Sequence, residues 1–265
     1  MVNLDSFDLD DAQRHAVVQT IAAEQLEGWQ PTDDHIAGLV ELLTGAKTFG
    51  EYLSPHLTDL GPAVRPRIFA RRTPYFLPGT SVLRNNFRVC DSATLANLEF
   101  IATAGRILQI HLGQKSPGLD VCALHQHVFG DVYAWAGAVR FVELRRGGRA
   151  FGSSRLIEQA LAPVANAVDA VARGGHGHDE LCRRLAEIYA DYNQIHPFRD
   201  GNGRTGTLLL HLLAARAGHR LHLDTVTRDD WIAASRESMP WDRDGKADPR
   251  PIMTVLNDCV RPVTR

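Results

Sequence analysis

The residues best suited to do chemistry lie in one short stretch, residues 196–207, which reads HPFRDGNGRTGT. His196 is the one group in this stretch that can accept a proton near neutral pH. Asp200 is its one carboxylate. Beside phosphates, a single carboxylate is suited to hold Mg²⁺ together with water and nucleotide oxygens. The stretch therefore predicts a nucleotide site with a base and a metal ligand.

The glycines of the same stretch predict where the phosphates bind. Gly201 and Gly203 allow a tight turn and bring backbone N–H groups close to a ligand, at a point where a helix begins with unpaired donors. Such a backbone attracts anions. Asn202 adds a side-chain donor, and Arg204 adds a planar guanidinium that matches phosphate oxygens. We expect these four residues to bind the phosphates of a nucleotide.

Each fragment of the stretch also has an ordinary structural interpretation. Gly-Asn-Gly between helices is usually only a turn, and a lone histidine is more often packed or solvated than a base. The combination is harder to explain in that way. His, Asp, Asn, Arg and two glycines fall within nine positions of one helix–loop–helix pattern. Taken together, they favour a functional site.

Two predicted helices must position this loop. Apolar residues recur at three- and four-residue spacing from Leu181 to Ile195, which predicts an amphipathic helix that ends at His196. After the loop, residues 205–217 are apolar almost all round, which predicts a helix buried in the centre of the domain and closed by Gly218. The loop is therefore expected at the junction of two core helices.

The stretch resembles the motif of the Fic family, H-x-F-x-[D/E]-G-N-G-R-x-x-R. Every fixed position matches except the last, where Thr207 replaces the second arginine. Residues 82–85 (VLRN) resemble the opening segment of that family, and residues 124–137 are similar to the helix and turn before its flap. The resemblance covers approximately residues 80 to 260. It implies a mainly α-helical Fic-type bundle with a short β-hairpin flap.

The resemblance implies a protein adenylyltransferase, which moves AMP from Mg-ATP to a hydroxyl side chain of a target protein and releases pyrophosphate. It implies that His196 is the catalytic base and that Asp200 holds the cofactor Mg²⁺. ATP, the substrate, would bind to Gly201, Asn202, Gly203 and Arg204. Such transfer depends mostly on positioning and charge neutralisation, which this loop can supply. Family members that transfer the terminal phosphate carry Lys where Gly203 stands, so the glycine favours AMP transfer.

Residues 138–152 alternate around Gly147-Gly148, which predicts a short β-hairpin in an otherwise helical chain. An isolated hairpin is marginal in water and must pack on the core or pair with another segment. The resemblance implies that it is the flap beside the active site, where an extended segment of the target adds by strand pairing. The docking residues implied for this flap are Val142, Glu143, Leu144 and Arg145.

The N-terminal residues predict three short helices, over residues 9–27, residues 32–44 and from Thr48 onward. On pattern alone they are a small packing module. The resemblance implies an antitoxin-like inhibitory module, because residues 23–28 (AEQLEG) resemble the family's inhibitory pattern [S/T]-x-x-x-E-[G/N]. Glu27 would be the inhibitory residue, with its carboxylate competing against the ATP γ-phosphate for the same donors. The chain would then be a toxin or effector with its restraint built in.

Ala23 and Thr207 depart from the family patterns at the two ends of one contact. The missing arginine normally pairs with the inhibitory glutamate and holds the γ-phosphate. Either the restraint is relaxed in this chain or another cation substitutes. Three alternatives therefore remain beside AMP transfer: a weakened transferase, a transferase of another nucleotidyl or phosphoryl group, and a non-catalytic nucleotide-binding module.

The predicted organisation is an inhibitory module (1–53), a proline-rich connector (54–79) and a Fic catalytic domain (80–265). The 265 residues, 44% of them hydrophobic, are enough for a large core. A net charge of −2 gives no sign of a nucleic-acid or membrane partner. Family toxins that pair with such antitoxins modify type II topoisomerases, which makes these the first candidate targets by analogy.

The four cysteines are scattered without paired spacing, and no apolar run has transmembrane length. This pattern predicts reduced thiols in a cytoplasmic protein and disfavours a zinc site or a disulfide framework. A secreted effector remains an alternative location. The sequence does not specify an oligomeric state.

Overall fold

The motif stretch joins two helices that run through the middle of the molecule. In this computed structural model, which describes residues 4–58, 60, 74–114 and 117–263, these helices are α7 (His178–Ile195) and α8 (Asn202–Arg216). Helix α7 ends where His196 takes left-handed backbone angles (φ 50°, ψ 64°). Both helices are lined with buried apolar residues. The predicted pair of core helices with the histidine at the turn is confirmed.

The second of these helices begins earlier than its apolar pattern indicated. Gly201, with φ 77°, is the residue before α8, and Asn202 and Gly203 form its first turn. The pattern of large apolar side chains starts only after these residues, so it missed the first three positions. The unpaired N–H groups of the helix therefore belong to the motif itself.

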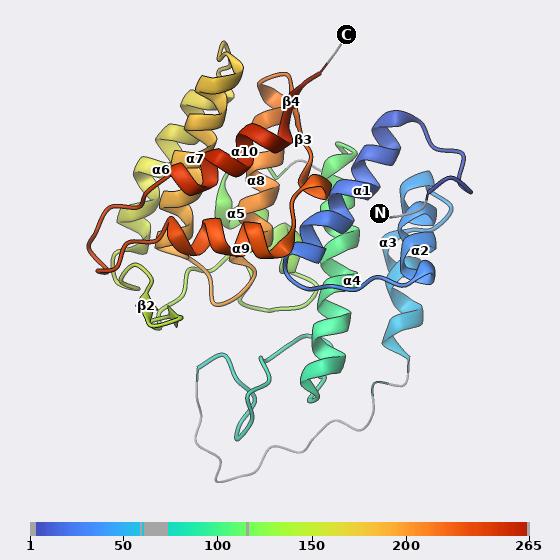
Figure 1. Ribbon diagram of the computed structural model, residues 1–265. Coiled ribbons are helices and arrows are strands. Elements are labelled where there is room, and N and C mark those ends of the chain that lie inside the picture. The colour runs from blue at the N-terminus through green and yellow to red at the C-terminus, as the bar shows by residue number, and fades with distance from the viewer. Residues whose placement is uncertain (1–3, 59, 61–73, 115–116, 264–265) are drawn as a thin grey trace.

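Other helices surround this pair (Figure 1). Helices α6 (Ile157–Ala172) and α10 (Arg250–Cys259) pack on α7, and α5 (Val121–Phe129) packs on α8. Helix α4 (Ser92–His111) packs against α5, and α9 (Arg228–Glu237) packs against α10. Helix α5 ends at Phe129, and Gly130 is its C-cap. The architecture is mainly α, as the resemblance implied.

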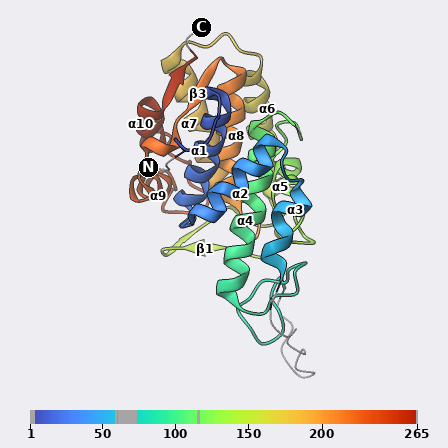
Figure 2. The same cartoon turned by 90° about the vertical axis from the view of Figure 1, so that its right-hand side faces the viewer.

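The N-terminal segment forms the three predicted helices, α1 (Asp11–Leu26), α2 (Asp33–Thr44) and α3 (Phe49–Leu53), followed by the short 3₁₀ helix η1 (Ser54–Leu57). Capping boxes begin the three α-helices, and Gly45 closes α2. Helix α1 packs on α4 and also contacts α8 and α9 (Figure 2). Apolar residues of α1 and α2 belong to the same buried cluster as those of α4 and α8.

Two small antiparallel ribbons complete the described fold. The predicted hairpin is present, but its paired part is short: β1 (Arg145–Arg146) pairs with β2 (Arg149–Ala150). A second ribbon pairs β3 (His219–Leu221) with β4 (Val260–Pro262). A single 3₁₀ turn, η2 (Leu223–Thr225), follows β3. The sequence analysis missed the second ribbon, because three-residue strands are too short to show alternation.

Much of the predicted connector, namely residues 59 and 61–73, lies outside the described part of the chain. The division into a module, a connector and a catalytic domain stays a prediction. All four cysteines are free thiols. Among the described residues, none of the helices combines the length and the apolar character needed to cross a bilayer.

Candidate active site

A cleft of about 560 Å³ opens over the motif loop. Its floor is formed by the end of α7 and the first turn of α8, and one side is formed by the β1–β2 hairpin. Helix α9 contributes another wall, and the last turn of α1 closes the cleft with Glu27. The motif residues that line it are His196, Arg199, Asp200, Gly201, Asn202 and Gly203. Residues distant in sequence therefore meet at one concave site.

The side chain of His196 lies deep in this cleft and stacks on Phe151, with ring centroids 3.7 Å apart and the planes 16° from parallel. Burial, together with the nearby charge of Arg140, lowers the pKa of His196 to about 3. Its Nδ1 has no hydrogen-bond partner among the described residues. The imidazole is therefore neutral at physiological pH, which is the form that can accept a proton.

Arg140 links the backbone at His196 to the backbone at both ends of the hairpin through hydrogen bonds. This side chain is only 1% exposed. Its Nε donates to the carbonyl of His196 at 2.7 Å, and its two Nη atoms donate to the carbonyls of Val142 and Gly152, each at 2.7 Å. A further bond of 3.1 Å reaches the carbonyl of Ile195. Sequence reasoning missed Arg140, although an arginine between the apolar residues 139 and 141 was a usable signal.

The motif loop is closed by its own side chains. The amide oxygen of Asn202 accepts from the N–H of Phe198, and its amide nitrogen donates to the carbonyl of Phe198, both at 2.9 Å. Asn202 thus uses its side chain to shape the loop, and the donor that it can offer a phosphate is its backbone N–H. His125 supports the loop from α5. Its Nδ1 accepts from the N–H of Gly137 at 2.8 Å, so its Nε2 donates to the carbonyl of Asp200 at 3.0 Å.

An added side chain would meet a close neighbour at two glycines of the loop. At Gly201, φ is positive and an added Cβ would lie 2.3 Å from the ring of Phe129. At Gly203 the backbone angle is ordinary, but an added Cβ would lie 1.7 Å from Oε1 of Glu27. The carboxylate of Glu27 therefore occupies the space directly above the Gly203 backbone. That space is where the unpaired N–H groups of the first turn of α8 would meet an anion.

The carboxyl group of Glu27 lies close to cations without pairing with any of them. Burial raises its pKa, and the charges of Arg204, Arg146 and Arg228 act in the opposite direction. Within the described part of the chain, Glu27 makes neither an ion pair nor a side-chain hydrogen bond. Its carboxylate therefore occupies the predicted phosphate site without a hydrogen bond or ion pair to the described residues.

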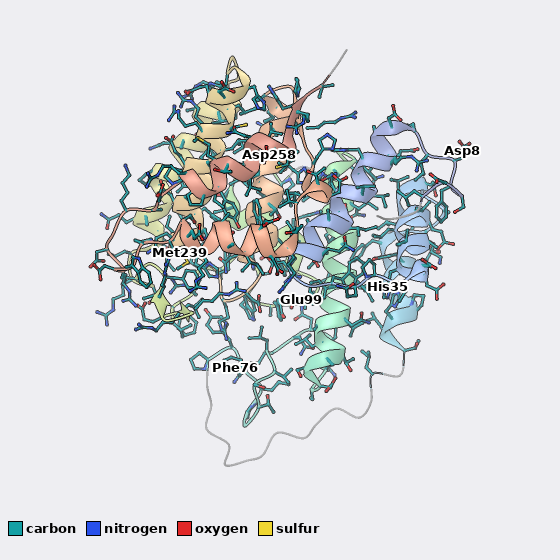
Figure 3. The ribbon with its side chains drawn as sticks, viewed as in Figure 1. Asp8, His35, Phe76, Glu99, Met239 and Asp258 are labelled. Atoms are coloured by element: carbon teal, nitrogen blue, oxygen red, sulfur yellow. The ribbon has the colours of Figure 1, made fainter. Side chains whose placement is uncertain are left out.

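Arg204 has buried partners outside the cleft. Its guanidinium forms an ion pair with Glu99 of α4 and lies 3.6 Å from Glu24 of α1. Glu99 is labelled in Figure 3. Its Nη1 donates to the hydroxyl of Thr103 at 3.2 Å. The phenol of Tyr133 donates to Glu99 from the other side. Burial raises the pKa of Glu24 to about 8. Sequence reasoning missed both glutamates.

Thr207, which stands at the second arginine position of the motif, does not reach the cleft. It is 2% exposed, and its hydroxyl donates to the carbonyls of Gly203 and Arg204 at 3.2 and 3.1 Å, within its own helix. A hydroxyl bonded in this way has no proton left to offer a ligand. Neither Arg204 nor Thr207 lines the cleft.

The predicted docking residues follow one edge of the hairpin. Glu143 accepts from the N–H and hydroxyl of Ser154 and forms a 2.9 Å ion pair with Arg243. Leu144 and Arg145 line the cleft, whereas Val142 contributes its carbonyl to Arg140. Among the described residues, this sheet consists of the two strands β1 and β2. The outer edge of β1 is therefore open to pairing.

Asp200 has the chemistry of a Mg²⁺ ligand. One oxygen of its carboxylate accepts from the N–H of Gly201 at 2.7 Å, and the residue lines the cleft. Among the described residues, no group of three or more His, Cys, Asp or Glu side chains is arranged to hold a metal. A single carboxylate fits Mg²⁺, which keeps several waters and takes its remaining ligands from substrate phosphates.

Comparison with known proteins agrees with this geometry. A family model described as "Fic/DOC family" matches residues 119–214. The chain is 32% identical over 167 residues to the "Probable protein adenylyltransferase Fic" of Salmonella typhimurium, a match that covers 62% of this chain and 84% of that protein. The chain belongs to the Fic family. The motif that the resemblance rested on lies inside the matched region.

Two further Fic proteins extend the comparison. "Protein adenylyltransferase VbhT" of Bartonella schoenbuchensis is 34% identical over 174 residues, which cover 62% of this chain and 35% of VbhT. The crystal structure of the effector BepC from Bartonella tribocorum, solved with bound AMPPNP, superposes with a TM-score of 0.63 at 21% identity and covers 72% of this chain and 97% of that chain. At that identity the second match supports the Fic fold alone.

Proposed function

We propose that this chain is a protein adenylyltransferase that transfers AMP from Mg-ATP to a hydroxyl side chain of a target protein, and that Glu27 restrains it. The observation that carries the proposal is that a neutral imidazole, a free carboxylate and the N-terminal turn of a helix open into one cleft beside an unpaired strand edge. The family relatives named as protein adenylyltransferases support the same activity.

The chemistry follows from the positions of these groups. An extended target segment pairs with the outer edge of β1 and presents its hydroxyl to His196. His196 accepts the hydroxyl proton while the target oxygen forms a bond to the α-phosphorus of ATP. The bond from that phosphorus to the bridging oxygen breaks, and diphosphate leaves with the electron pair. The backbone N–H groups of Asn202 and Gly203 hold the negative phosphate oxygens.

The metal and the base complement each other in this scheme. Asp200 would hold Mg²⁺, which neutralises phosphate charge when bound. The negative charge of the nucleotide also favours the protonated form of His196, opposing the burial and the Arg140 charge that lower its pKa. The histidine can therefore be neutral before the reaction and hold the proton during it.

The target is proposed only as a class of chemistry. The acceptor is a Tyr, Thr or Ser hydroxyl within an extended segment, because the docking edge is a strand. Type II topoisomerases are the first proteins to test, on the family analogy alone. We place the activity in the cytoplasm, the location that the sequence predicts.

The direct test is transfer of label from α-phosphate-labelled ATP into lysate proteins. We compare the native chain, Glu27→Gly, and Glu27→Gly combined with His196→Ala. Label should increase in Glu27→Gly and fall by about 10²–10⁴-fold when His196 is also removed. Gln25→Gly, in the same last turn of α1 but exposed, controls for weakening of the helix by glycine. If Gln25→Gly increased labelling as much as Glu27→Gly does, the result would contradict a specific inhibitory role for Glu27.

A second candidate is favoured by Thr207 and Arg204, neither of which offers a charge to the cleft. On this alternative the chain binds nucleotide but transfers AMP poorly or not at all. It predicts that Glu27→Gly binds ATP and labels nothing, itself included. ATP labelled at the γ-phosphate, together with labelled UTP and GTP, separates a binding module from a transferase of another group.

A further inference from the structure

The cleft needs positive charge that the motif does not provide. A triphosphate brings several negative charges, and a lone Mg²⁺ neutralises only part of them. Thr207 is uncharged and bonded to its own helix. Arg204 forms a buried ion pair with Glu99, lies 3.6 Å from Glu24 and does not line the cleft. Other cations must therefore face the Gly203 backbone if ATP is to bind there.

Six arginines stand near the loop or line the walls of the cleft: Arg145, Arg146, Arg149, Arg199, Arg228 and Arg236. Three of them are engaged elsewhere. Arg145 donates to the carbonyl of Gly148, Arg149 donates to carbonyls at the end of α9 and lies over Trp241, and Arg199 lies over Phe76. Their guanidinium groups therefore already have partners within the described part of the chain.

Arg146 and Arg228 differ from these three. In the described part of the chain, neither side chain has a hydrogen-bond acceptor or an ion-pair partner. Both charges act on the carboxyl group of Glu27 and lower its pKa against the effect of burial. Arg236 also lines the cleft, but it stands about 12 Å further along α9 than Arg228.

These two arginines approach Glu27 from different elements. Arg228 is the first residue of α9, and its guanidinium lies 3.6 Å from the position of a Cβ on Gly28, the residue after Glu27. Arg146 belongs to β1, and its charge also lowers the pKa of His196. Glu27 therefore shares the cleft with a cation from the hairpin and a cation from α9.

We propose that Arg146 and Arg228 form a pair of cations over Gly203 that attracts the Glu27 carboxylate in the restrained chain and binds the β- and γ-phosphates of ATP when Glu27 leaves. This inference rests on the proposed function, because it names the residues that receive the leaving diphosphate. A guanidinium presents a planar set of donors that matches phosphate oxygens. One pair of side chains thus serves both the restraint and the substrate.

The test is binding of ATP and of AMP, each with Mg²⁺, to the Glu27→Gly chain and to the same chain carrying Arg146→Gln, Arg228→Gln or both. Each single change should weaken ATP about tenfold and the double change about a hundredfold, the loss expected for charge-assisted hydrogen bonds. AMP affinity should change less than twofold, because AMP lacks the two outer phosphates. Isothermal titration calorimetry measures both.

Arg236→Gln is the matched control, since it removes the same charge from the same cleft and, like Arg228, from α9. It should leave the ratio of ATP to AMP affinity unchanged. Arg228→Lys should restore part of the loss, because it returns the charge without the planar donors. Equal weakening of ATP and AMP, or an equal loss in Arg236→Gln, would overturn the pair.

Binding and transfer are measured separately, so the two proposals can fail independently. If the arginine variants lose ATP affinity but no protein is ever labelled, the cation-pair proposal stands and the transferase proposal fails. If AMP is transferred while both variants bind ATP normally, the transferase proposal stands and the cation-pair proposal fails. Thermal unfolding of each variant confirms that a loss of binding is not a loss of fold.

Discussion

Glu24 and Glu27 lie almost one turn apart on α1, and the structure gives them opposite surroundings. Glu24 is fully buried with Arg204, Thr103 and Glu99 around it. Glu27 faces the cleft and has no ion-pair partner among the described residues. Burial raises the pKa of both carboxyl groups. They differ in what lies opposite, which is a fixed guanidinium for one and a ligand site for the other.

Glu24 attaches α1 to the rest of the fold, whereas Glu27 is the residue proposed to restrain the active site. The network around Glu24 joins α1 to α4 and α8 through one buried arginine. Glu27 makes no bond that would be lost if it left, so it can be displaced by an anion that binds the same place. On the proposed restraint, the Glu27 carboxylate must leave the space above Gly203 before an anion binds there, and Gly28, with φ 106°, follows it directly in the chain.

The largest expected effect is on stability when the arginine of the network is removed. Arg204→Met leaves Glu99 buried without the cation of its ion pair, which should lower the free energy of unfolding by about 3–5 kcal/mol. Urea unfolding measures it. Adding Glu99→Gln to the same chain removes that buried carboxylate and should recover much of the loss. A loss below about 1 kcal/mol for Arg204→Met alone would show that the network does not attach α1.

A smaller effect is expected from pH at Glu24. Its pKa is raised from 4.5 to about 8, so the folded chain binds a proton that the unfolded chain releases above pH 4.5. Stability from this group is fully present below the unfolded pKa and is lost as pH rises toward about 8. Glu24→Gln should remove about 1–3 kcal/mol of that pH dependence. Unchanged slopes of unfolding free energy against pH would contradict the assignment.

The next change tests the space above Gly203. In Gly203→Ala the new methyl group would overlap the carboxylate oxygen of Glu27, so the carboxylate must move. The same methyl group narrows the approach to the backbone donors. In a chain that carries both Glu27→Gly and Gly203→Ala, ATP should therefore bind at least about tenfold more weakly than in the chain with Glu27→Gly alone. Calorimetric titration measures this. If the chain with both changes binds ATP as well as Glu27→Gly does, the methyl does not block the phosphate site.

The smallest effect on stability is expected at Glu27. Glu27→Gln should change the free energy of unfolding by less than about 0.5 kcal/mol, because no hydrogen bond or ion pair among the described residues is lost. ATP affinity should nevertheless rise, since the competing charge is gone. Parallel urea unfolding and ATP titration report the two quantities. A stability loss comparable to that of Arg204→Met would show that Glu27 also attaches the helix.

The sequence predicted local features of this site better than long-range ones. The turn at His196, the hairpin at Gly147 and the caps of the N-terminal helices follow from neighbouring residues. The partners of Arg204 do not, because Glu24 and Glu99 come from helices far away in the chain. A guanidinium suits a phosphate or a carboxylate equally well, so residue type alone could not decide which one Arg204 meets.

The buried side chain of Arg140 has a consequence for how new targets arise. One guanidinium holds the backbone of the target-docking hairpin and the backbone of the proposed base at fixed separation. On the proposed docking mode, hairpin side chains other than Arg146 can change while the reach from a docked strand to His196 stays constant. Partner choice would then vary with the exposed hairpin residues, whereas the reaction geometry would depend on keeping Arg140.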